Sequence, residues 1–560
     1  MAQDPADDTE PFDLVVVGGG IIGTGVARDA ALRGLRVCVI EKEDFGWGTT
    51  ARSTRLVHGG LRYLEHYDFA LVREALHERR ALIRIAPHLV RPIPFLLPVF
   101  RGRGRSRFVV RLGLVLYDVL ARANLGRHRW WKRAEVLARE PLLDRPDLVG
   151  AFCFWDAQVR YPERLVVENM LDVWAHGGVG YNHTEAVGLE MAGRHAVGVR
   201  VRDVFTGDER VVRGGLILNV GGPWVTNVDN AFGFARPALT RRTKGIHLLV
   251  DAIIDHAMVL QCGDGERIIF LVPWGPYTLI GTTDTDYAGP NDVVAASAED
   301  VQYLLDETNA NLAVSLGPTD VHFTWAGLRP LIPEGRGSAG AVSRRHLLVD
   351  HRQDGGADNV VSVVGGKITS YRHIAADIVR RLRRRLGVKR ASRTARVPLP
   401  GGRPHDRVAL LRQVGARLPH LTDDDVARLF AVYGARVAEL LEVAGESDDN
   451  GHLAPVSRLT REEVRFVVRR EGARSVSDVL LRRTMLGLER DQARGVVEPL
   501  AAYMARLLDW DRGRRRAEVA AYLAHVDRQR AAVEALAGAY RPQQPDPWYA
   551  KIVRLPRRAR

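Results

Sequence analysis

Glycines near the start of the chain have a spacing that suits dinucleotide binding. Gly18, Gly20 and Gly23 follow an apolar run that ends at Val17, and a helical pattern and a second apolar run then end at Glu41. In such a motif, Gly18 permits a tight turn, Gly20 lets the backbone approach a pyrophosphate, and Gly23 lets helix and strand pack closely. The helix start offers free N–H groups to the phosphates, and Glu41 can accept hydrogen bonds from ribose hydroxyls.

Three later segments favour FAD over NAD as the dinucleotide. A hydroxyl-rich loop over 49–55 suits a path along the pyrophosphate toward a flavin, and two further predicted strands end on glycine pairs. The second pair opens a helix whose N-terminus can stabilise negative charge on a reduced flavin. Besides the first motif, the predicted FAD-binding residues are Thr49, Thr50, Ser53, Thr54, Gly221, Gly222, Trp224, Gly365, Gly366, Lys367, Ile368 and Thr369.

These motifs require strands, turns and helices in a particular order, which predicts an α/β fold. With 560 residues, the chain exceeds one compact core, and about two to four domains are expected. We expect a discontinuous Rossmann-like FAD-binding domain interleaved with a β-sheet substrate domain, then an all-helical C-terminal cap after a Pro/Gly linker at 397–404. The predicted ranges are 1–90, 155–235 and 355–390 for FAD, 91–154 and 236–354 for substrate, and 395–560 for the cap.

Composition is that of an ordinary soluble globular protein, with 46% hydrophobic and 26% charged residues. The formal charge of +14 is compatible with nucleic acid, an anionic membrane surface or an anionic substrate. Cys38, Cys153 and Cys262 lie far apart and predict neither a disulfide framework nor a metal site, so a reducing cytosol is the simplest setting. An acidic, polar start predicts no secretory signal, and no apolar run is long enough to span a bilayer.

Segment 101–133 intersperses arginines with apolar residues and tryptophans. This pattern has two interpretations. One is a monotopic contact with an anionic bilayer. The other is a buried helix with basic caps, because amphipathic helices usually face a core.

The block His58–Glu65, which reads HGGLRYLE, is specific enough to suggest a family. With it, the chain resembles the FAD-dependent glycerol-3-phosphate dehydrogenases. Further similarity lies at 18–25, 86–89, 219–224, 244–247, 281–284, 327–331, 365–372 and, in the cap, 478–484. One departure is Tyr161–Leu165, where bacterial relatives often show paired acids, so the role of that segment is open.

The resemblance implies oxidation of glycerol 3-phosphate to dihydroxyacetone phosphate, with hydride transfer to flavin N5 and electrons passed to a membrane quinone. From the pattern of segment 101–133, we expect a cytoplasmic enzyme attached peripherally to the inner face of the cell membrane. We also expect a homodimer. An oxidase that uses O₂ is the nearest alternative. A flavoprotein that binds nucleic acid is less favoured, because the basic residues are dispersed without a platform of stacking aromatics.

The resemblance also implies roles for individual residues. Arg62 and Tyr63 can grip the substrate phosphate, since a guanidinium binds phosphate bidentately. Arg329 resembles the family arginine over the flavin, where it can bind phosphate or stabilise the developing carbonyl oxygen. Lys367 is expected to touch the substrate or the N1–C2 region of the flavin.

Three further residues complete the predicted substrate site. His58 is the candidate general base, because an unperturbed histidine pKa of about 6.5 permits proton uptake near neutrality. The sequence leaves open whether His58 or a cationic neighbour takes the proton. Lys244 and His247 are additional candidates for substrate binding. For Thr283 and Asp284, a role in forming a turn and a contact with the flavin are equally expected.

Overall fold

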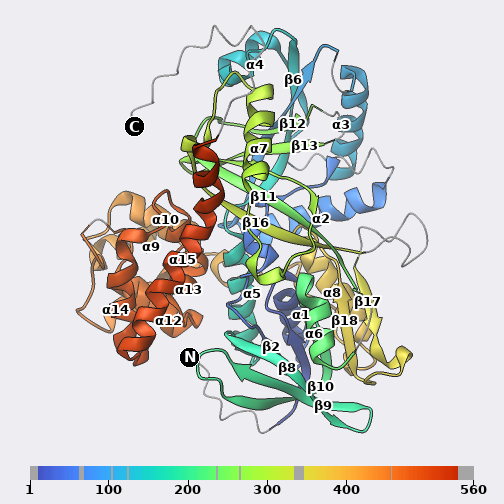
Figure 1. Cartoon of the computed structure of the whole chain (residues 1–560), viewed down its shortest axis with the longest axis vertical. Coiled ribbons are helices and arrows are strands. Elements are labelled where there is room, and N and C mark those ends of the chain that lie inside the picture. Colours follow the sequence, from blue (N-terminus) through green and yellow to red (C-terminus); the bar gives the residue numbers. More distant parts are fainter. Residues whose placement is uncertain are drawn as a thin grey trace.

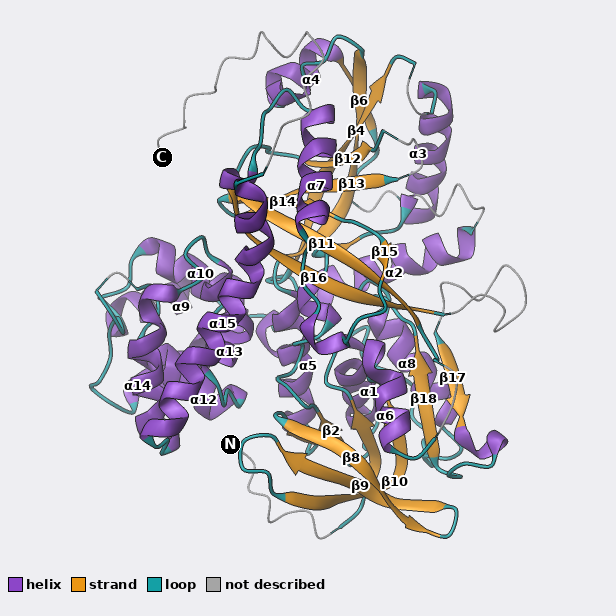
Figure 2. Ribbon diagram, in the orientation of Figure 1, coloured by secondary structure: helices purple, strands orange, loops and turns teal. Residues whose placement is uncertain are grey.

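The computed structural model describes residues 10–61, 68–102, 105–122, 125–234, 238–263, 267–332, 346–455 and 457–539. Two β-sheets lie one above the other along the long axis, and a helical domain stands beside them (Figures 1 and 2). This is the mixed α/β fold that the sequence predicts, with a Rossmann-like first sheet and a helical C-terminal domain. Among the described residues, no helix is long and apolar enough to cross a bilayer.

The first sheet has eight strands. Its main path runs β17 (Leu347–Asp350), β18 (Val360–Val364), β10 (Glu209–Asn219), β1 (Phe12–Val17), β2 (Val37–Ile40) and β7 (Val179–Tyr181). All neighbours on this path are parallel except the edge strand β17. The first half of β10 leaves the path and pairs with β9 (His195–Asp203), which pairs with β8 (Thr184–Ala192).

Strand β1 has an unbroken apolar sequence because both of its faces are buried. Leu14 and Val16 point into the larger core, whereas Val15 and Val17 join a separate core on the opposite face. A parallel strand covered on both faces has no polar side. The covering helix on the first face is α1 (Ile21–Leu32), which packs between α5 (Pro162–Ala175) and α8 (Tyr371–Leu382), while α6 (Val225–Ala231) lies near β8 and β18.

The second sheet has ten strands and carries the longest pairings. Its bounds are β3 (Leu56–Val57), β4 (Val90–Phe100), β5 (Arg129–Lys132), β6 (Leu148–Val159), β11 (Arg241–Asp251), β12 (Ala257–Gln261), β13 (Ile268–Trp274), β14 (Tyr277–Gly281), β15 (Thr285–Asp286) and β16 (Val321–Leu331). Helix α7 (Ala298–Asn311) packs on β11 and β14. The other helices of this part are α2 (Phe69–Ile85), α3 (Arg107–Ala121) and α4 (Arg133–Arg139).

Helices alone make up the described C-terminal part beyond the linker, apart from one isolated bridge between His452 and Thr460. The α-helices are α9 (Arg407–Arg417), α10 (Asp423–Tyr433), α11 (Val437–Gly445), α12 (Arg461–Glu471), α13 (Val476–Asp478), α14 (Val497–Leu508) and α15 (Arg512–Ala537). Helix α15 leaves the cap and packs on β16 and α7 of the second sheet (Figure 2).

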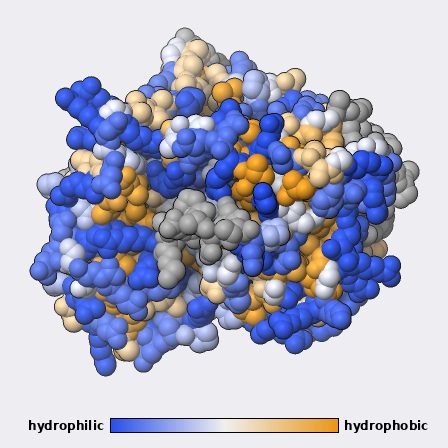
Figure 3. Space-filling view, turned by 90° about the horizontal axis from the view of Figure 1, so that it is seen from below, coloured by the Kyte–Doolittle hydropathy of each residue, from blue (hydrophilic) through white to orange (hydrophobic). Residues whose placement is uncertain are grey.

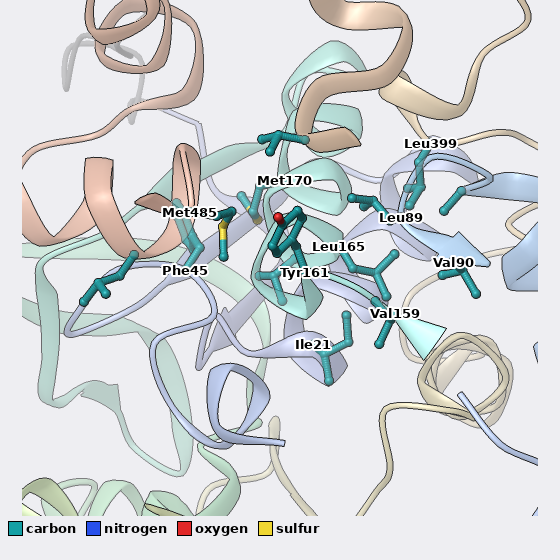
Figure 4. Packing of buried hydrophobic residues seen from close by; sticks show 14 of the residues in the cluster. Ile21, Phe45, Leu89, Val90, Val159, Tyr161, Leu165, Met170, Leu399 and Met485 are labelled. Carbon is teal, nitrogen blue, oxygen red and sulfur yellow. The ribbon is translucent and has the colours of Figure 1, made fainter. Parts of the chain in front are cut away.

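Helix α5 joins the cap to the rest of the molecule. In the core, Met170 lies beside Met485 of the cap on one side, and Leu165 lies toward Leu89 and Leu399 on the other (Figure 4). Ion pairs reinforce this packing, because Arg164 donates to Glu471 of α12 and both side chains are fully buried. Segment 161–165, the one departure from the family pattern, therefore has a structural role at this junction.

The sheets do not follow the predicted domain ranges at every point. Strand β17 pairs with β18 in the first sheet, although residues 347–350 fall in the predicted substrate domain. Strand β6 runs across the predicted boundary at 154/155. The division into domains stays a prediction.

Helix α3 is buried on one side only. Leu114, Tyr117 and Ala121 face the protein, whereas Phe108 and Leu112 are 76% and 62% exposed. The helix lies in the upper part of Figure 1, away from the lower end of the molecule, whose surface is mainly hydrophilic with separate hydrophobic areas (Figure 3). The wholly buried interpretation of this segment is therefore wrong for α3, although Trp131 of β5 is indeed buried, at 8% exposure.

Candidate functional site

A cavity of about 530 Å³ lies where three strands of the first sheet end. Strands β1, β10 and β18 are parallel, so their carboxyl ends meet at one edge, which is where α/β folds bind ligands. All three glycine turns that follow these strands line the cavity, as do the loop over 49–54, His58, Arg329 and Lys367.

The first glycine turn has no room for a side chain at two of its positions. Gly18 has φ of +112°, and a Cβ there would lie 2.5 Å from the carbonyl oxygen of Val220. A Cβ on Gly23 would lie 1.9 Å from the carbonyl oxygen of Gly18, so this glycine serves helix packing and does not line the cavity. Gly20 lines the cavity at the start of α1, where it caps the helix without a side chain.

Glu41 lies in the cavity wall with its carboxylate held by backbone amides. Gly19 N–H donates to Oε2 at 2.7 Å, and Glu43 N–H donates to Oε1 at 3.0 Å. Burial raises the pKa of Glu41, while these two hydrogen bonds oppose the rise. Each oxygen keeps lone-pair capacity for a ribose hydroxyl.

The hydroxyls of the 49–54 loop line the cavity but also hold the loop in place. Thr49 donates to the Leu328 carbonyl at 2.7 Å, and Thr50 Oγ1 accepts from Ile21 N–H at the start of α1 at 3.2 Å. Ser53 accepts from Arg55 N–H at 3.3 Å, and Thr54 bonds a ring nitrogen of a histidine. The loop is thereby fixed against α1 and β16.

The second and third turns complete the wall. Gly221 and Gly222 line it beside Trp224, whose indole N–H donates to Asp292 at 2.8 Å. The third turn contributes Gly365, Gly366, Lys367, Ile368 and Thr369 just before α8. Both of its glycines have positive φ, +82° and +118°.

Arg329 reaches the cavity from β16 and is oriented by three acceptors. Its guanidinium donates to Asp284 Oδ1 at 3.0 Å, to Thr282 Oγ1 at 3.0 Å and to the Thr283 carbonyl at 3.1 Å. Burial lowers the pKa of Arg329, and Asp284 opposes this. Arginine has five N–H donors, so two of them have no acceptor among the described residues and are available to a ligand.

His58 stands in the same cavity on the turn after β3. Burial lowers its pKa below 6.5, Asp156 opposes this, and the charges of Lys367 and Arg79 lower it further. The imidazole is therefore neutral at pH 7 and able to accept a proton.

Asp156 fixes the turn that carries His58. It accepts from the Gly59 amide at 3.2 Å, the Tyr117 hydroxyl at 2.7 Å and Arg79 at 2.7 Å. Sequence reasoning missed this carboxylate, and no local pattern in the sequence identifies it.

Two predicted substrate residues do not reach the cavity described here. Lys244 forms an ion pair with Asp300 at 2.5 Å. His247 is 2% exposed, stacks on Trp325 and bonds Thr54 at 2.8 Å, and burial lowers its pKa to about 3. The structure gives these two side chains supporting positions. Arg62 and Tyr63 lie outside the described residues.

Asp292 is another residue that sequence reasoning missed. It lines the cavity and accepts from Trp224 and Lys42, although it lies some 250 positions from Lys42. Trp47 also lines the cavity and lies against Trp224, with ring centroids 5.5 Å apart. The sequence held no local signal for Asp292. Trp47 lies between Gly46 and Gly48, directly before the hydroxyl-rich loop, so its position could have identified it.

The fold and the glycine-lined cavity are those of a dinucleotide-binding protein. Residues 13–372 match the family model for FAD dependent oxidoreductases, and residues 392–515 match the model for the C-terminal domain of alpha-glycerophosphate oxidase. The chain is 34% identical to a glycerol-3-phosphate dehydrogenase of Synechocystis sp., over 87% of this chain and 91% of the relative. It is 37% identical to a D-erythritol 1-phosphate dehydrogenase of Brucella abortus, over 85% and 95% respectively.

Among solved structures, the glycerol-3-phosphate dehydrogenase of Bacillus halodurans complexed with FAD is similar, with a TM-score of 0.77 and 26% identity. The alignment covers 94% of this chain and 96% of that one. The chain therefore belongs to the FAD-dependent glycerol-3-phosphate dehydrogenase family, and the resemblance noted in the sequence is confirmed.

The residues present fit FAD. The backbone can approach a pyrophosphate at Gly18 and Gly20, where the cradle admits no side chain at Gly18. Glu41 offers carboxylate oxygens for a ribose, and the cavity continues to the third turn before α8. The cofactor predicted from the sequence is confirmed by the family.

Proposed function

We propose that this protein oxidises glycerol 3-phosphate to dihydroxyacetone phosphate and passes the electrons to a membrane quinone. The observation that carries this proposal is the convergence of Arg329, Lys367 and His58 in the cavity that three glycine turns line. Two cations suit a phosphate dianion, and a neutral imidazole suits the proton of a secondary alcohol.

Bound FAD supplies a hydride acceptor at N5. The chain's own residues bind and orient the alcohol so that its C–H faces that acceptor, and they manage its proton. Arg329 holds either the phosphate or the developing carbonyl oxygen with the two donors that its neighbours leave available. His58 is the proposed base, since its lowered pKa keeps it neutral at pH 7. In the proposal, Arg62 and Tyr63 complete the phosphate site.

The length of the polyol needs a direct test, because the D-erythritol 1-phosphate dehydrogenase is as similar to this chain as the glycerol-3-phosphate dehydrogenase of Synechocystis sp. is. Anaerobic bleaching of the FAD absorbance by a panel of phosphorylated polyols tests the substrate, with unphosphorylated glycerol as control. We expect rapid bleaching by glycerol 3-phosphate. Slow bleaching by it, with rapid bleaching by a four-carbon polyol phosphate, would assign the longer substrate instead.

The electron acceptor is tested in air with glycerol 3-phosphate as substrate. Reduction of a soluble quinone analogue without stoichiometric hydrogen peroxide supports the dehydrogenase. Peroxide formed in step with substrate consumption would assign the oxidase alternative.

Membrane attachment through α3 is part of the proposal. Phe108, Leu112 and Val119 are 76%, 62% and 66% exposed, and they recur at the spacing of one helix face. Arg105 and Arg111 are exposed beside this stripe. An apolar stripe flanked by cations suits the surface of an anionic bilayer. Trp131 is buried in the core and takes no part.

Flotation with anionic liposomes tests this attachment. The variant Phe108→Glu/Leu112→Glu/Val119→Glu should bind the liposomes less than the native protein does. The control is Val204→Glu, because Val204 is 51% exposed on a β-hairpin loop away from α3. This variant should bind as the native protein does. Equal partition of the triple variant and the native protein would refute attachment through α3. The homodimer stays a prediction.

A further inference from the structure

A second cavity, of about 230 Å³, lies between the α2–β4 turn, the Pro/Gly linker and the cap. It shares no lining residue with the FAD cavity. The α2–β4 turn and the linker were both singled out in the sequence, and the reaction uses neither. Its lining residues are Pro87, His88, Arg91, Gly401, Gly402, Arg403, His405, Arg407, Phe430 and Gly434.

Cations dominate this lining. Arg91, Arg403 and Arg407 contribute three guanidiniums, and no carboxylate is among the described lining residues. Burial and the neighbouring charges of Arg160 and Arg407 lower the pKa of Arg91. Like charges held this close repel one another, and a bound anion would relieve that repulsion.

The carboxylates near the cavity are already engaged. Glu168 accepts from the Gly401 amide at 2.6 Å, and Asp172 is bound by Arg28 at 2.7 Å, with Arg403 3.8 Å away. Asp406 caps the N-terminus of α9 through the amides of residues 408 and 409. Among the described residues, Arg403 therefore pairs with Asp172 at 3.8 Å, whereas no carboxylate forms an ion pair with Arg91 or Arg407.

His88 lies beneath the guanidiniums and belongs to the protein interior. Its side chain is 7% exposed, and its Nε2 faces the buried carboxylate of Glu168, with Oε1 3.7 Å away. Both ring nitrogens are covered by protein atoms, so the arginines are the charged groups that a ligand in the cavity would meet.

Glycines pack directly on this imidazole. A Cβ on Gly401 would lie 2.5 Å from His88 Nε2, and a Cβ on Gly434 would lie 2.9 Å from its Cγ. Phe430 forms an apolar wall, with the Arg407 guanidinium 4.7 Å from its ring centroid. The cavity thus has an apolar wall and a cationic rim.

We propose that this cavity is an accessory anion site that binds inorganic phosphate or a small soluble phosphate monoester. The guanidiniums of Arg91, Arg403 and Arg407 at its rim hold the oxyanion. The volume is smaller than the about 300 Å³ typical of the smallest drug-sized pockets, which suits a ligand of this size. Because the lining comes from the α2–β4 turn, the linker and the cap, the bound anion ties these three segments together.

Hydrogen–deuterium exchange of the FAD-loaded full chain, with and without inorganic phosphate at constant ionic strength, tests the site. We expect phosphate to protect amides at 86–91 and 399–407. Arg407→Ala should weaken this effect about ten- to a hundredfold in phosphate concentration, since a hydrogen bond to a charged group contributes about 1.5–3 kcal/mol. Arg412→Ala, an exposed arginine on the same helix but outside the lining, should respond as the native protein does.

Several outcomes would overturn the proposal. They are no protection of these segments at saturating phosphate, equal protection by chloride at the same ionic strength, and an unchanged phosphate response in Arg407→Ala. Protection only by vesicles that contain phosphatidic acid, and not by soluble phosphate or a phosphate monoester, would assign a lipid headgroup instead. Phosphate bound in the FAD cavity would instead protect amides near 58 and 329, so the location of the protected amides distinguishes the two sites. Turnover of glycerol 3-phosphate in Arg407→Ala should be unchanged.

Discussion

Replacing Arg329 with alanine removes the best-oriented cation of the proposed active site. Three of its five N–H donors are used by Thr282, Thr283 and Asp284, which leaves two for the substrate. Each hydrogen bond to a charged group contributes about 1.5–3 kcal/mol, so the loss of two costs at least about 3 kcal/mol. That corresponds to a decrease of roughly 150-fold in kcat/KM.

The assay is steady-state reduction of a dye by glycerol 3-phosphate without oxygen, with the FAD content of each preparation measured from its absorbance. Arg241→Ala is the matched control, because Arg241 lies on the neighbouring strand β11 and pairs with the exposed Asp286 at 2.9 Å, much as Arg329 pairs with Asp284. We expect normal FAD content in both variants and normal kcat/KM in the control.

A decrease in kcat/KM of less than about fivefold in Arg329→Ala would refute the role given to the two available donors. A variant that has lost FAD would show instead that Arg329 holds the fold or the cofactor. The ratio of kcat to KM effects adds detail. Loss confined to KM indicates phosphate binding, whereas loss in kcat indicates contact with the developing carbonyl oxygen.

Three further changes test other parts of the molecule. Glu41→Gln should weaken FAD binding about tenfold or more, because it removes the charged carboxylate that accepts hydrogen bonds from the ribose hydroxyls. Unchanged FAD retention on dilution would contradict this. Glu471→Gln should lower the free energy of unfolding, measured in urea, by about 3–5 kcal/mol. The reason is that Arg164 and Arg436 overcome burial and lower the pKa of Glu471 to about 2. The control is Glu446→Gln, in the exposed pair with Arg469 at 2.7 Å, which should cost less than about 1 kcal/mol.

The third change is a decrease in pH. The pKa of His247 is about 3 in the folded chain and about 6.5 unfolded, so the unfolded state takes up the proton first, and stability is lost as the pH falls below 6.5. Between pH 6.5 and pH 5 this residue alone accounts for about 2 kcal/mol, and His247→Gln should show a correspondingly shallower dependence of melting temperature on pH than the native protein.

The sequence allowed the glycine turns to be predicted because each one combines a local apolar run with a glycine whose position is sterically fixed. Gly18 is an example, since it has φ of +112° and a Cβ there would lie 2.5 Å from the Val220 carbonyl oxygen. The helical cap was predicted for a similar reason, because helical periodicity is a local property. The pairing of strand β17 with β18 could not be predicted in this way, since tertiary structure decides which strands pair.

The supporting residues of the site could not be predicted in this way. Asp156 holds the His58 turn from 97 positions away, and Asp292 binds Trp224 from 68 positions away. His247 is predicted to bind substrate from its residue type, and in the structure its ring is buried between Thr54 and Trp325. Burial and long-range pairing decide these roles, and neither is visible in the order of residues.

The cap acquires a role from its contact with the cofactor loop. Asp44, three positions after Glu41, is fully buried, and Arg483 of the cap donates to both of its oxygens at 2.6 and 2.9 Å. Arg482 donates to the same carboxylate at 2.7 Å. A buried carboxylate requires such partners, so two arginines of the cap, together with Asn182, hold the loop that follows Glu41. The helical domain thereby supports the adenosine end of the FAD site, although the described part of it contributes no residue to the cavity.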